Sequence, residues 1–384
     1  MSGVSETVSA NGGANADTAG AWDLVGHAPA VTELRSALSG GRLSHAYLFS
    51  GPPSVGKAAL AIRLAQALVC EAGAEEAPCL KCRICRQVEA GEAPDVERIA
   101  VGGVCDESSH RDHATDNSTR IRICQVRRLE RVASLAPFQA ARRIFILDTA
   151  DDLQPEAAHA LLKTLEEPPP AVLMVLLAAD VEALLPTIRS RCQQLRLRPS
   201  PLTELASALE RRLEITAEEA GELARLASGR YGLAQRLHTD PSLRVLRETA
   251  AADVRRLNRA DRNERFDYAA QLARSWRGER ESVLATLDVW RRWWRDVLLA
   301  ASGLDGATDQ AVDVAAAAMM QEDATLCSAA QALRALQATQ RAREHLIENT
   351  NPQLALEVMM LDLPLLPGAV REPKGEEARQ VAAP

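Results

Sequence analysis

Apolar residues in the first half of the chain form short continuous runs, separated by stretches of helical periodicity. The runs occupy residues 46–49, 144–147 and 172–177. Between them, apolar residues recur at helical spacing over residues 57–69 and 155–165. Because strands that alternate with helices are typical of βαβ units, the pattern predicts an α/β domain with a parallel sheet over residues 21–199.

The strand-like runs stop at Pro199-Ser200-Pro201, and only helical periodicity follows. Short amphipathic helices are predicted at residues 202–213, 217–228 and 233–238. They would form a small lid domain over residues 200–242.

Helical periodicity alone continues over residues 243–368, which predicts a third, all-helical domain. Trp290, Trp293 and Trp294 recur there at i, i+3 and i+4, the spacing of a buried helix face, which favours packing over a nucleotide or DNA platform. Residues 1–20 and 369–384 lack periodicity, and we expect both ends to be disordered.

Composition and charge narrow the class of protein. The 384 residues are 47% apolar and 25% charged, which excludes a disordered or fibrous chain and leaves room for two or three domains. The longest apolar run, residues 171–179, is about half the length of a membrane span, and no charged-then-apolar signal segment opens the chain. We therefore expect a cytoplasmic protein without a membrane partner. Its net charge of −7 argues against DNA binding by bulk charge alone.

A phosphate-binding loop is predicted between the first strand and the next helix. In the segment SGPPSVGK, Gly51, Gly56 and Lys57 match the G-x-x-x-x-G-K pattern, in which backbone N–H groups and a helix N-terminus hold phosphates. Ala58, however, has no hydroxyl for the Mg²⁺ that bridges the β- and γ-phosphates, and Ser54 stands where such loops commonly have glycine. The sequence therefore predicts a loop with the conformation of a P-loop. It disfavours Mg²⁺ binding and ATP hydrolysis at this loop.

An acidic residue follows the second apolar run. Asp148 is placed to hold a Mg²⁺-bound water, but Thr149 stands next, where an ATPase needs a carboxylate to activate the attacking water. Asp148 could equally do no more than end a buried strand. Together with Gly51, Gly56 and Lys57 it outlines a degenerate nucleotide site, at which binding of ATP or ADP stays open.

Four of the eight cysteines lie close together in the sequence. Cys70, Cys79, Cys82 and Cys85 follow the pattern C-x₈-C-x₂-C-x₂-C, in an insertion after the P-loop helix. Two close pairs of thiolates can complete a tetrahedral shell without an open position, so we predict a structural Zn²⁺. Free or redox-active thiols are the alternative.

A second group, Cys105, His110 and His113, invites a further metal hypothesis. The surrounding residues 102–119 are polar and aperiodic, so we expect a solvated loop there and not a metal site. The remaining cysteines stand singly in apolar patterns and are expected to be small core residues: Cys124, Cys192 and Cys327.

Six motifs in fixed order give the chain a resemblance to a known family. They are HAYLF at 45–49, the four cysteines, APDV at 93–96, LLKTLEEPP at 161–169, LLPTIRSRC at 184–192 and NPQLALE at 351–357. On these motifs the chain resembles the AAA+ clamp-loader subunits of bacterial DNA polymerase III, most closely the delta prime type, over residues 22–365. The resemblance implies a P-loop α/β domain, a helical lid and a helical collar that joins subunits in a ring.

The resemblance also implies a role for one arginine. In that family the Ser-Arg-Cys motif supplies an arginine finger to ATP bound on the neighbouring subunit, and Arg191 occupies this position. A guanidinium is always charged and can contact a γ-phosphate bidentately. A surface arginine in a helix cap is the alternative.

Departures from the family's motor subunits indicate which kind of member this is. The motor residues that contact phosphate, metal or water are replaced by Ala58, Thr149, Ala178-Ala179 and Gly232. Arg230, two positions from Gly232, could still reach a nucleotide. The resemblance thus implies a stator in DNA replication, without independent ATPase activity but part of the polymerase III holoenzyme.

The implied partners are the gamma/tau motor subunits and delta in a hetero-pentamer, the sliding clamp, and primer-template DNA reached through the complex. Two other functions stay open. One is a gamma/tau-like ATPase, against which Ala58 and Thr149 argue. The other is a module that binds nucleotide without turnover.

Overall fold

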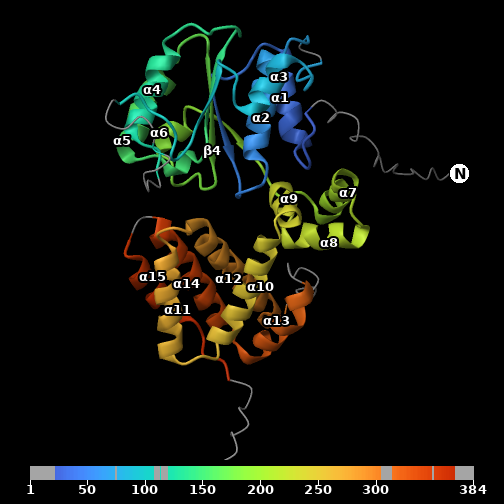
Figure 1. Ribbon diagram of the computed structural model, residues 1–384, viewed down its shortest axis with the longest axis vertical. Helices are drawn as coiled ribbons and strands as arrows, with labels where there is room; N and C mark the ends of the chain where they lie inside the picture. Colours follow the sequence, from blue (N-terminus) through green and yellow to red (C-terminus); the bar gives the residue numbers. More distant parts are fainter. Residues whose placement is uncertain are drawn as a thin grey trace, which may run out of the picture. The chain divides into compact units, whose positions relative to one another are not determined.

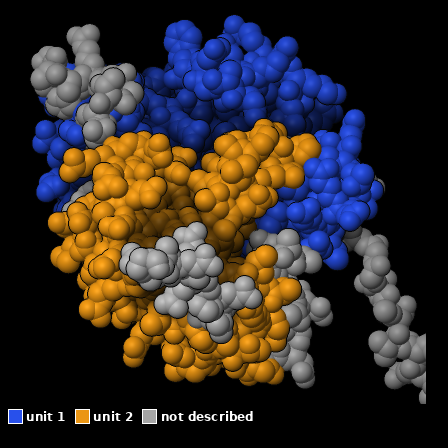
Figure 2. Space-filling model, turned by 60° about the horizontal axis from the view of Figure 1, so that its bottom comes forward, with its two compact units in different colours: residues 1–235 blue, residues 236–384 orange. Residues whose placement is uncertain are grey.

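The computed structural model describes residues 22–73, 76–107, 113, 120–303, 314–347 and 350–367. The chain divides into two compact units, residues 1–235 and 236–384, which Figure 2 colours separately. The two ends that we expected to be disordered lie outside the described residues, as does His110.

Within the described part of the first unit, five strands form one parallel sheet in the order β2-β3-β4-β1-β5. The strands are β1 (Ala46–Ser50), β2 (Val96–Ile99), β3 (Arg143–Leu147), β4 (Val172–Ala178) and β5 (Gln193–Arg196). The strands predicted from the apolar runs are β1, β3 and β4, and their bounds agree to within one residue. The edge strands β2 and β5 are partly exposed, so no continuous apolar run marked them.

Helices cover both faces of this sheet (Figure 1). One face carries α1 (Ala28–Ser39), α2 (Lys57–Val69) and α3 (Arg83–Ala90), and the other carries α4 (Ile123–Ala133), α5 (Pro155–Glu166) and α6 (Pro186–Arg189). In β1, Tyr47 and Phe49 pack into the first layer, whereas Ala46 and Leu48 pack into the second. This alternation follows from the pleat of the strand. The predicted α/β class with a parallel sheet is confirmed.

Three helices follow the sheet: α7 (Leu202–Leu213), α8 (Ala217–Leu226) and α9 (Tyr231–Thr239). Their bounds lie within two residues of the helices predicted after Pro201. Helix α7 packs on α8, and Leu205, Leu209 and Leu223 are buried there.

The described part of the second unit is helical. Its helices are α10 (Pro241–Leu257), α11 (Arg262–Ser275), α12 (Arg280–Ala301), α13 (Val314–Leu326), α14 (Ala329–Ile347) and α15 (Pro352–Asp362). Helix α12 packs against α10, α13 and α14, and it buries Trp290, Trp293 and Trp294. The indole Nε1 of Trp290 donates to the Ala250 carbonyl oxygen at 2.8 Å. The three tryptophans are therefore packing residues, as their spacing predicted.

None of the helices in the described ranges is long and apolar enough to span a bilayer.

Candidate functional site

The P-loop connects the carboxyl end of β1 to α2. Gly51 and Gly56 have φ angles of 147° and 119°, in the region that favours glycine. A Cβ on Gly51 would lie 2.4 Å from the Leu197 carbonyl oxygen, so no side chain fits there. Ser54 also has a positive φ, of 60°, at the position where glycine is common. The loop conformation expected from the sequence is therefore present, with one strained residue where the sequence departs from the pattern.

Lys57 contacts the carbonyl groups of its own loop. Its Nζ donates to the carbonyl oxygens of Gly51 at 2.6 Å and Pro52 at 3.1 Å. Burial lowers the pKa of Lys57, and the nearby carboxylates of Asp151 and Asp148 oppose this effect. The lysine thus lies between the loop and the acidic end of β3.

Two carboxylates follow β3. Asp148 forms an ion pair with Arg98, and the Thr149 hydroxyl donates to the Asp148 carbonyl oxygen at 2.6 Å. Asp151, in the short 3₁₀ helix η1 (Ala150–Asp152), accepts two backbone N–H groups that follow β4, at 2.9 and 3.0 Å. The sequence pattern did not single out Asp151, although its place three residues after Asp148 could have indicated it. Both carboxylates have protein partners.

The first turn of α9 approaches the P-loop closely. A Cβ on Gly232 would lie 3.0 Å from the Ser54 carbonyl oxygen, so the absence of a side chain permits this approach. Arg230 is only 7% exposed, and its Nη1 donates to the Pro53 carbonyl oxygen at 3.4 Å. The arginine two positions from Gly232 therefore reaches the backbone of the loop itself.

His27 supports the P-loop from the segment before α1. Its Nε2 lies 2.8 Å from the Val55 carbonyl oxygen, an acceptor to which an Nε2–H donates. Burial lowers the pKa of His27, because the charged imidazolium is poorly solvated there. Burial therefore favours the neutral imidazole in this arrangement.

Arg191 lies at the amino end of β5, whereas the P-loop lies at the carboxyl end of the neighbouring strand β1. Arg191 precedes Gln193, the first residue of β5, which pairs with Tyr47 of β1. The P-loop follows Ser50, the last residue of β1, which pairs with Arg196. Strands advance about 3.3 Å per residue, so the pair at Gln193 and the pair at Arg196 are about 10 Å apart along β5. Arg191 is therefore not placed to reach the P-loop of its own chain.

The Arg191 side chain joins two of the sequence motifs. Its Nη2 lies 2.8 Å from Glu166 Oε1, at the end of α5, and its Nη1 donates to the Thr187 carbonyl oxygen at 3.0 Å. The arginine side chain is 35% exposed. The segments LLKTLEEPP and LLPTIRSRC are thus held together at one partly exposed guanidinium.

The four cysteines between α2 and α3 form one cluster. The Sγ atoms of Cys70, Cys79, Cys82 and Cys85 all lie within 4.8 Å of one another. Backbone N–H donors, from Lys81 first and then Cys82, lower the pKa of Cys79 to about 6, whereas burial raises the pKa of Cys85. Four thiols at this spacing, with N–H groups directed at sulfur, fit a tetrahedral zinc shell, so the cluster could hold zinc.

Our expectation of a solvated loop is wrong for two residues of the segment 102–119. Cys105 and His113 are buried and lie beside Cys124 at the start of α4. Burial raises the pKa of the Cys124 thiol, and Cys105 adds to this effect. The sequence did not connect Cys124 to this group, because no spacing rule links a helix residue to an aperiodic segment. The remaining single cysteines are buried, as expected: Cys192 and Cys327.

The APDV motif has a structural role. The buried Asp95 carboxylate accepts backbone N–H groups from Phe138 at 2.6 Å and from Gln139 and Ala140, both at 2.8 Å. Burial alone would raise the pKa of Asp95, but these donors and Arg143 outweigh it, so the pKa lies below its ordinary value. Asp95 therefore holds the turn that leads into β3.

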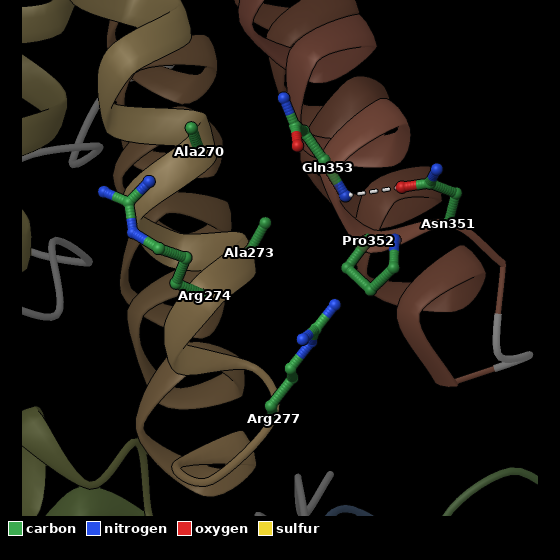
Figure 3. Close-up of a pocket in the computed structure, with 7 residues that line it drawn as sticks. All are labelled: Ala270, Ala273, Arg274, Arg277, Asn351, Pro352 and Gln353. Carbon is green, nitrogen blue, oxygen red and sulfur yellow. Dashed lines mark hydrogen bonds between the residues drawn. The ribbon is translucent and has the colours of Figure 1, made fainter.

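The NPQLALE motif begins α15 in the second unit. Asn351 Oδ1 accepts the backbone N–H of Gln353 at 3.0 Å, which caps the helix. Figure 3 shows this cap beside a hollow of about 520 Å³, with Arg274 and Arg277 opposite. The described residues that line the hollow include no carboxylate, cysteine or histidine, so it lacks acid–base groups.

Comparison with known proteins agrees with these motifs. The family described as "DNA polymerase III, delta subunit" matches residues 26–201. The delta' subunit of Pseudomonas aeruginosa is 33% identical, over 62% of this chain and 67% of that protein. The delta' subunit of Bacillus subtilis is 35% identical over 43% of this chain and 46% of that protein.

Tau and gamma subunits are also similar. The tau subunit of Escherichia coli is 35% identical over 55% of this chain, and the gamma subunit of Buchnera aphidicola is 33% identical over 46% of it. The chain spans only 30% and 44% of the length of these two relatives.

Among solved structures, a DNA polymerase III gamma subunit-related protein from Thermotoga maritima overlaps 86% of this chain and 97% of its own, at 18% identity. Its TM-score to this chain is 0.38. The identity of 33% over two thirds of the Pseudomonas protein shows that the two chains belong to one family. On that similarity, the chain belongs to the AAA+ clamp-loader family of bacterial DNA polymerase III.

Proposed function

We propose that this chain is a delta prime-type stator of the clamp loader, which supplies Arg191 to ATP bound by a neighbouring ATPase subunit. The position of Arg191 at the opposite end of the strands from its own P-loop is the observation that most supports this role. A partly exposed guanidinium at that end is available to a subunit that packs against it. There it would stabilise the negative charge that develops on the transferred phosphoryl group.

The residues of this chain's own nucleotide site favour a subunit that does not itself hydrolyse ATP. Ala58 offers no ligand to Mg²⁺, and Thr149 offers no carboxylate to activate water. Asp148 is paired with Arg98, and Lys57 contacts loop carbonyl groups. Each of these features removes or occupies a group that an active site of this type would use.

We further propose that residues 200–242 act as the lid and residues 243–368 as the collar. The collar would join gamma/tau and delta in a hetero-pentamer, and DNA and the sliding clamp would be reached through that complex. Three apolar residues on α15 support an interface in the collar. Leu354, Val358 and Leu361 recur at i, i+4 and i+7 and are 59%, 50% and 56% exposed.

The zinc proposed for the four cysteines would be structural. Four protein ligands leave no position for a reacting water, so the ion would fasten the α2–α3 connection and take no part in ATP hydrolysis.

The deciding experiment uses the complex assembled with its co-expressed partner subunits. Arg191→Ala should leave assembly intact but lower DNA- and clamp-stimulated ATPase by about 10-fold or more, because fingers in related chemistry contribute 10³–10⁵ and this one serves a single site of several. Arg189→Ala is the matched control, since Arg189 ends the short helix α6 two residues before Arg191 and pairs with Glu182 at 2.7 Å. Lys57→Ala should be nearly silent. If Lys57 were required and Arg191 dispensable, the chain would be a gamma/tau-like motor.

A nucleotide-binding module without turnover is the second candidate. The P-loop conformation, with Gly51 and Gly56 at positive φ and Lys57 as the first residue of α2, favours it. Binding of ATP or ADP to the isolated chain, lost on Lys57→Ala and unaccompanied by hydrolysis, would support this addition to the stator role.

A further inference from the structure

Cys105, His113 and Cys124 form a second cluster of metal-ligating side chains, separate from the four cysteines. They are only 5%, 1% and 7% exposed. One ligand atom from each lies within 4.8 Å of the other two, and His113 Nε2 is 3.2 Å from Cys124 Sγ. A thiol, an imidazole and a second thiol therefore converge on one buried point.

The two clusters lie on opposite faces of the sheet. Cys70 packs with the core on the α1–α3 face. Cys124 belongs to α4, whose Val126 and Leu129 pack in the core of the other face (Figure 1). One ion cannot serve both clusters, so the second cluster would be a site of its own.

The ligand chemistry and the spacing favour zinc. Zn–S bonds of about 2.3 Å and a Zn–N bond of about 2.0 Å in a tetrahedron place the two sulfur atoms about 3.8 Å apart and each sulfur about 3.5 Å from the nitrogen. The separations in this cluster are 3.2 Å for one pair and at most 4.8 Å for the others, so side-chain movements of about 1 Å or less would match them. Thiolate and imidazole ligands also suit zinc better than magnesium or calcium, which prefer oxygen.

Charge balance supports the same ion. Two thiolates, a neutral imidazole and a divalent cation have no net charge, which suits a site so deeply buried.

We propose that Cys105, His113 and Cys124 bind a second zinc ion, and that this ion fastens Cys105 and His113 to the first turn of α4. Among the described residues three ligands converge here against four in the other cluster, so a chelator should remove this ion before the one proposed for the four cysteines. The inference does not depend on the stator role or on Arg191.

Metal analysis of the full chain, purified under reducing conditions, tests the proposal. The wild-type protein should carry about two zinc ions per chain. Cys124→Ser and His113→Asn should each carry about one, and so should Cys82→Ser in the other cluster. Cys192→Ser and Cys327→Ser are matched controls, because both cysteines are buried and lie outside the two clusters. These controls should keep both ions.

A cobalt titration of the zinc-free wild-type chain gives a second measurement that needs no variant. Two cobalt ions with thiolate-to-cobalt charge-transfer bands should bind, and His113→Asn should lose one of them. A single ion that is lost with Cys82→Ser and kept with Cys124→Ser would overturn the proposal. So would a fully reduced, metal-free protein that binds cobalt at the four cysteines alone.

Discussion

The Arg191 guanidinium lies 2.8 Å from the Glu166 carboxylate. This ion pair connects the last residue of α5 with the turn that follows α6. Both side chains are partly exposed, so the pair is screened by solvent and contributes about 0–1 kcal/mol at most. The pair can therefore hold the guanidinium near the sheet edge without preventing its release to a phosphate on another subunit.

Glu166→Gln should thus be mild. We expect the free energy of unfolding to change by less than about 1 kcal/mol, because an exposed ion pair contributes little. The assembled complex should keep its stimulated ATPase within about 3-fold, in contrast to Arg191→Ala. Steady-state ATPase assays measure this, with Glu167→Gln as the neighbouring control. A loss as large as that of Arg191→Ala would mean that the pair persists in the active complex.

The isolated chain should show negligible ATP hydrolysis. Ala58 and Thr149 deprive its own site of a Mg²⁺ ligand and a base. A coupled phosphate-release assay measures the rate, and Lys57→Ala identifies any contaminating ATPase. Turnover of about 1 s⁻¹ or faster that disappears in Lys57→Ala would contradict the proposed function.

Metal removal should loosen the connection between α2 and α3. Cys82→Ser breaks one of four thiolate contacts in the cluster that also contains Cys70, Cys79 and Cys85. We expect loss of the proposed structural zinc and faster proteolysis within residues 70–85, because metal-binding free energy is also folding free energy. Limited proteolysis with mass spectrometry locates the cuts. Unchanged proteolysis in a zinc-depleted chain would exclude a structural role for the ion.

Asp95→Asn should destabilise the first unit. The variant keeps one carbonyl oxygen but loses the charge that three backbone N–H groups and Arg143 stabilise. We expect a loss of about 2–3 kcal/mol in the free energy of unfolding, measured by urea denaturation. Asp180→Asn, in an exposed loop, is the control and should change it by less than about 0.5 kcal/mol.

Acid should weaken the support of the P-loop by His27. Burial holds the pKa of His27 in the folded chain below its ordinary value of 6.5, so the unfolded chain binds the proton first as pH falls. The contribution of His27 to stability is complete above pH 6.5 and declines as pH falls through 6.5 toward the lower folded-state pKa. Urea denaturation on either side of that pH measures the slope, and His27→Gln should reduce it. An equal slope in this variant would assign the effect to other groups.

The buried parts of the fold were predictable from local pattern. β1, β3 and β4 are buried on both faces and therefore appear as continuous apolar runs. The edge strand β5 does not, because two of its four residues are exposed.

Those parts of the candidate site whose residues all lie in one short sequence motif were predictable. The conformation of the P-loop and the cluster of four cysteines follow from spacing within one segment. The contact of Arg230 with Pro53 and the convergence of Cys105 with Cys124 join segments far apart in the chain or without periodicity. Such contacts depend on tertiary packing, which no local pattern encodes.

The contacts of Lys57 with the carbonyl oxygens of Gly51 and Pro52, and of Arg230 with that of Pro53, compete with any phosphate for the two cations. A nucleotide whose phosphates needed both cations would bind only to the fraction of molecules in which they have turned away from these carbonyl groups. Its apparent dissociation constant is the intrinsic one divided by that fraction, so a loop that is open about 1% of the time binds about 100-fold more weakly. Cellular ATP would then occupy this subunit less completely than an ATPase subunit with a free lysine, even if the two loops had the same intrinsic affinity.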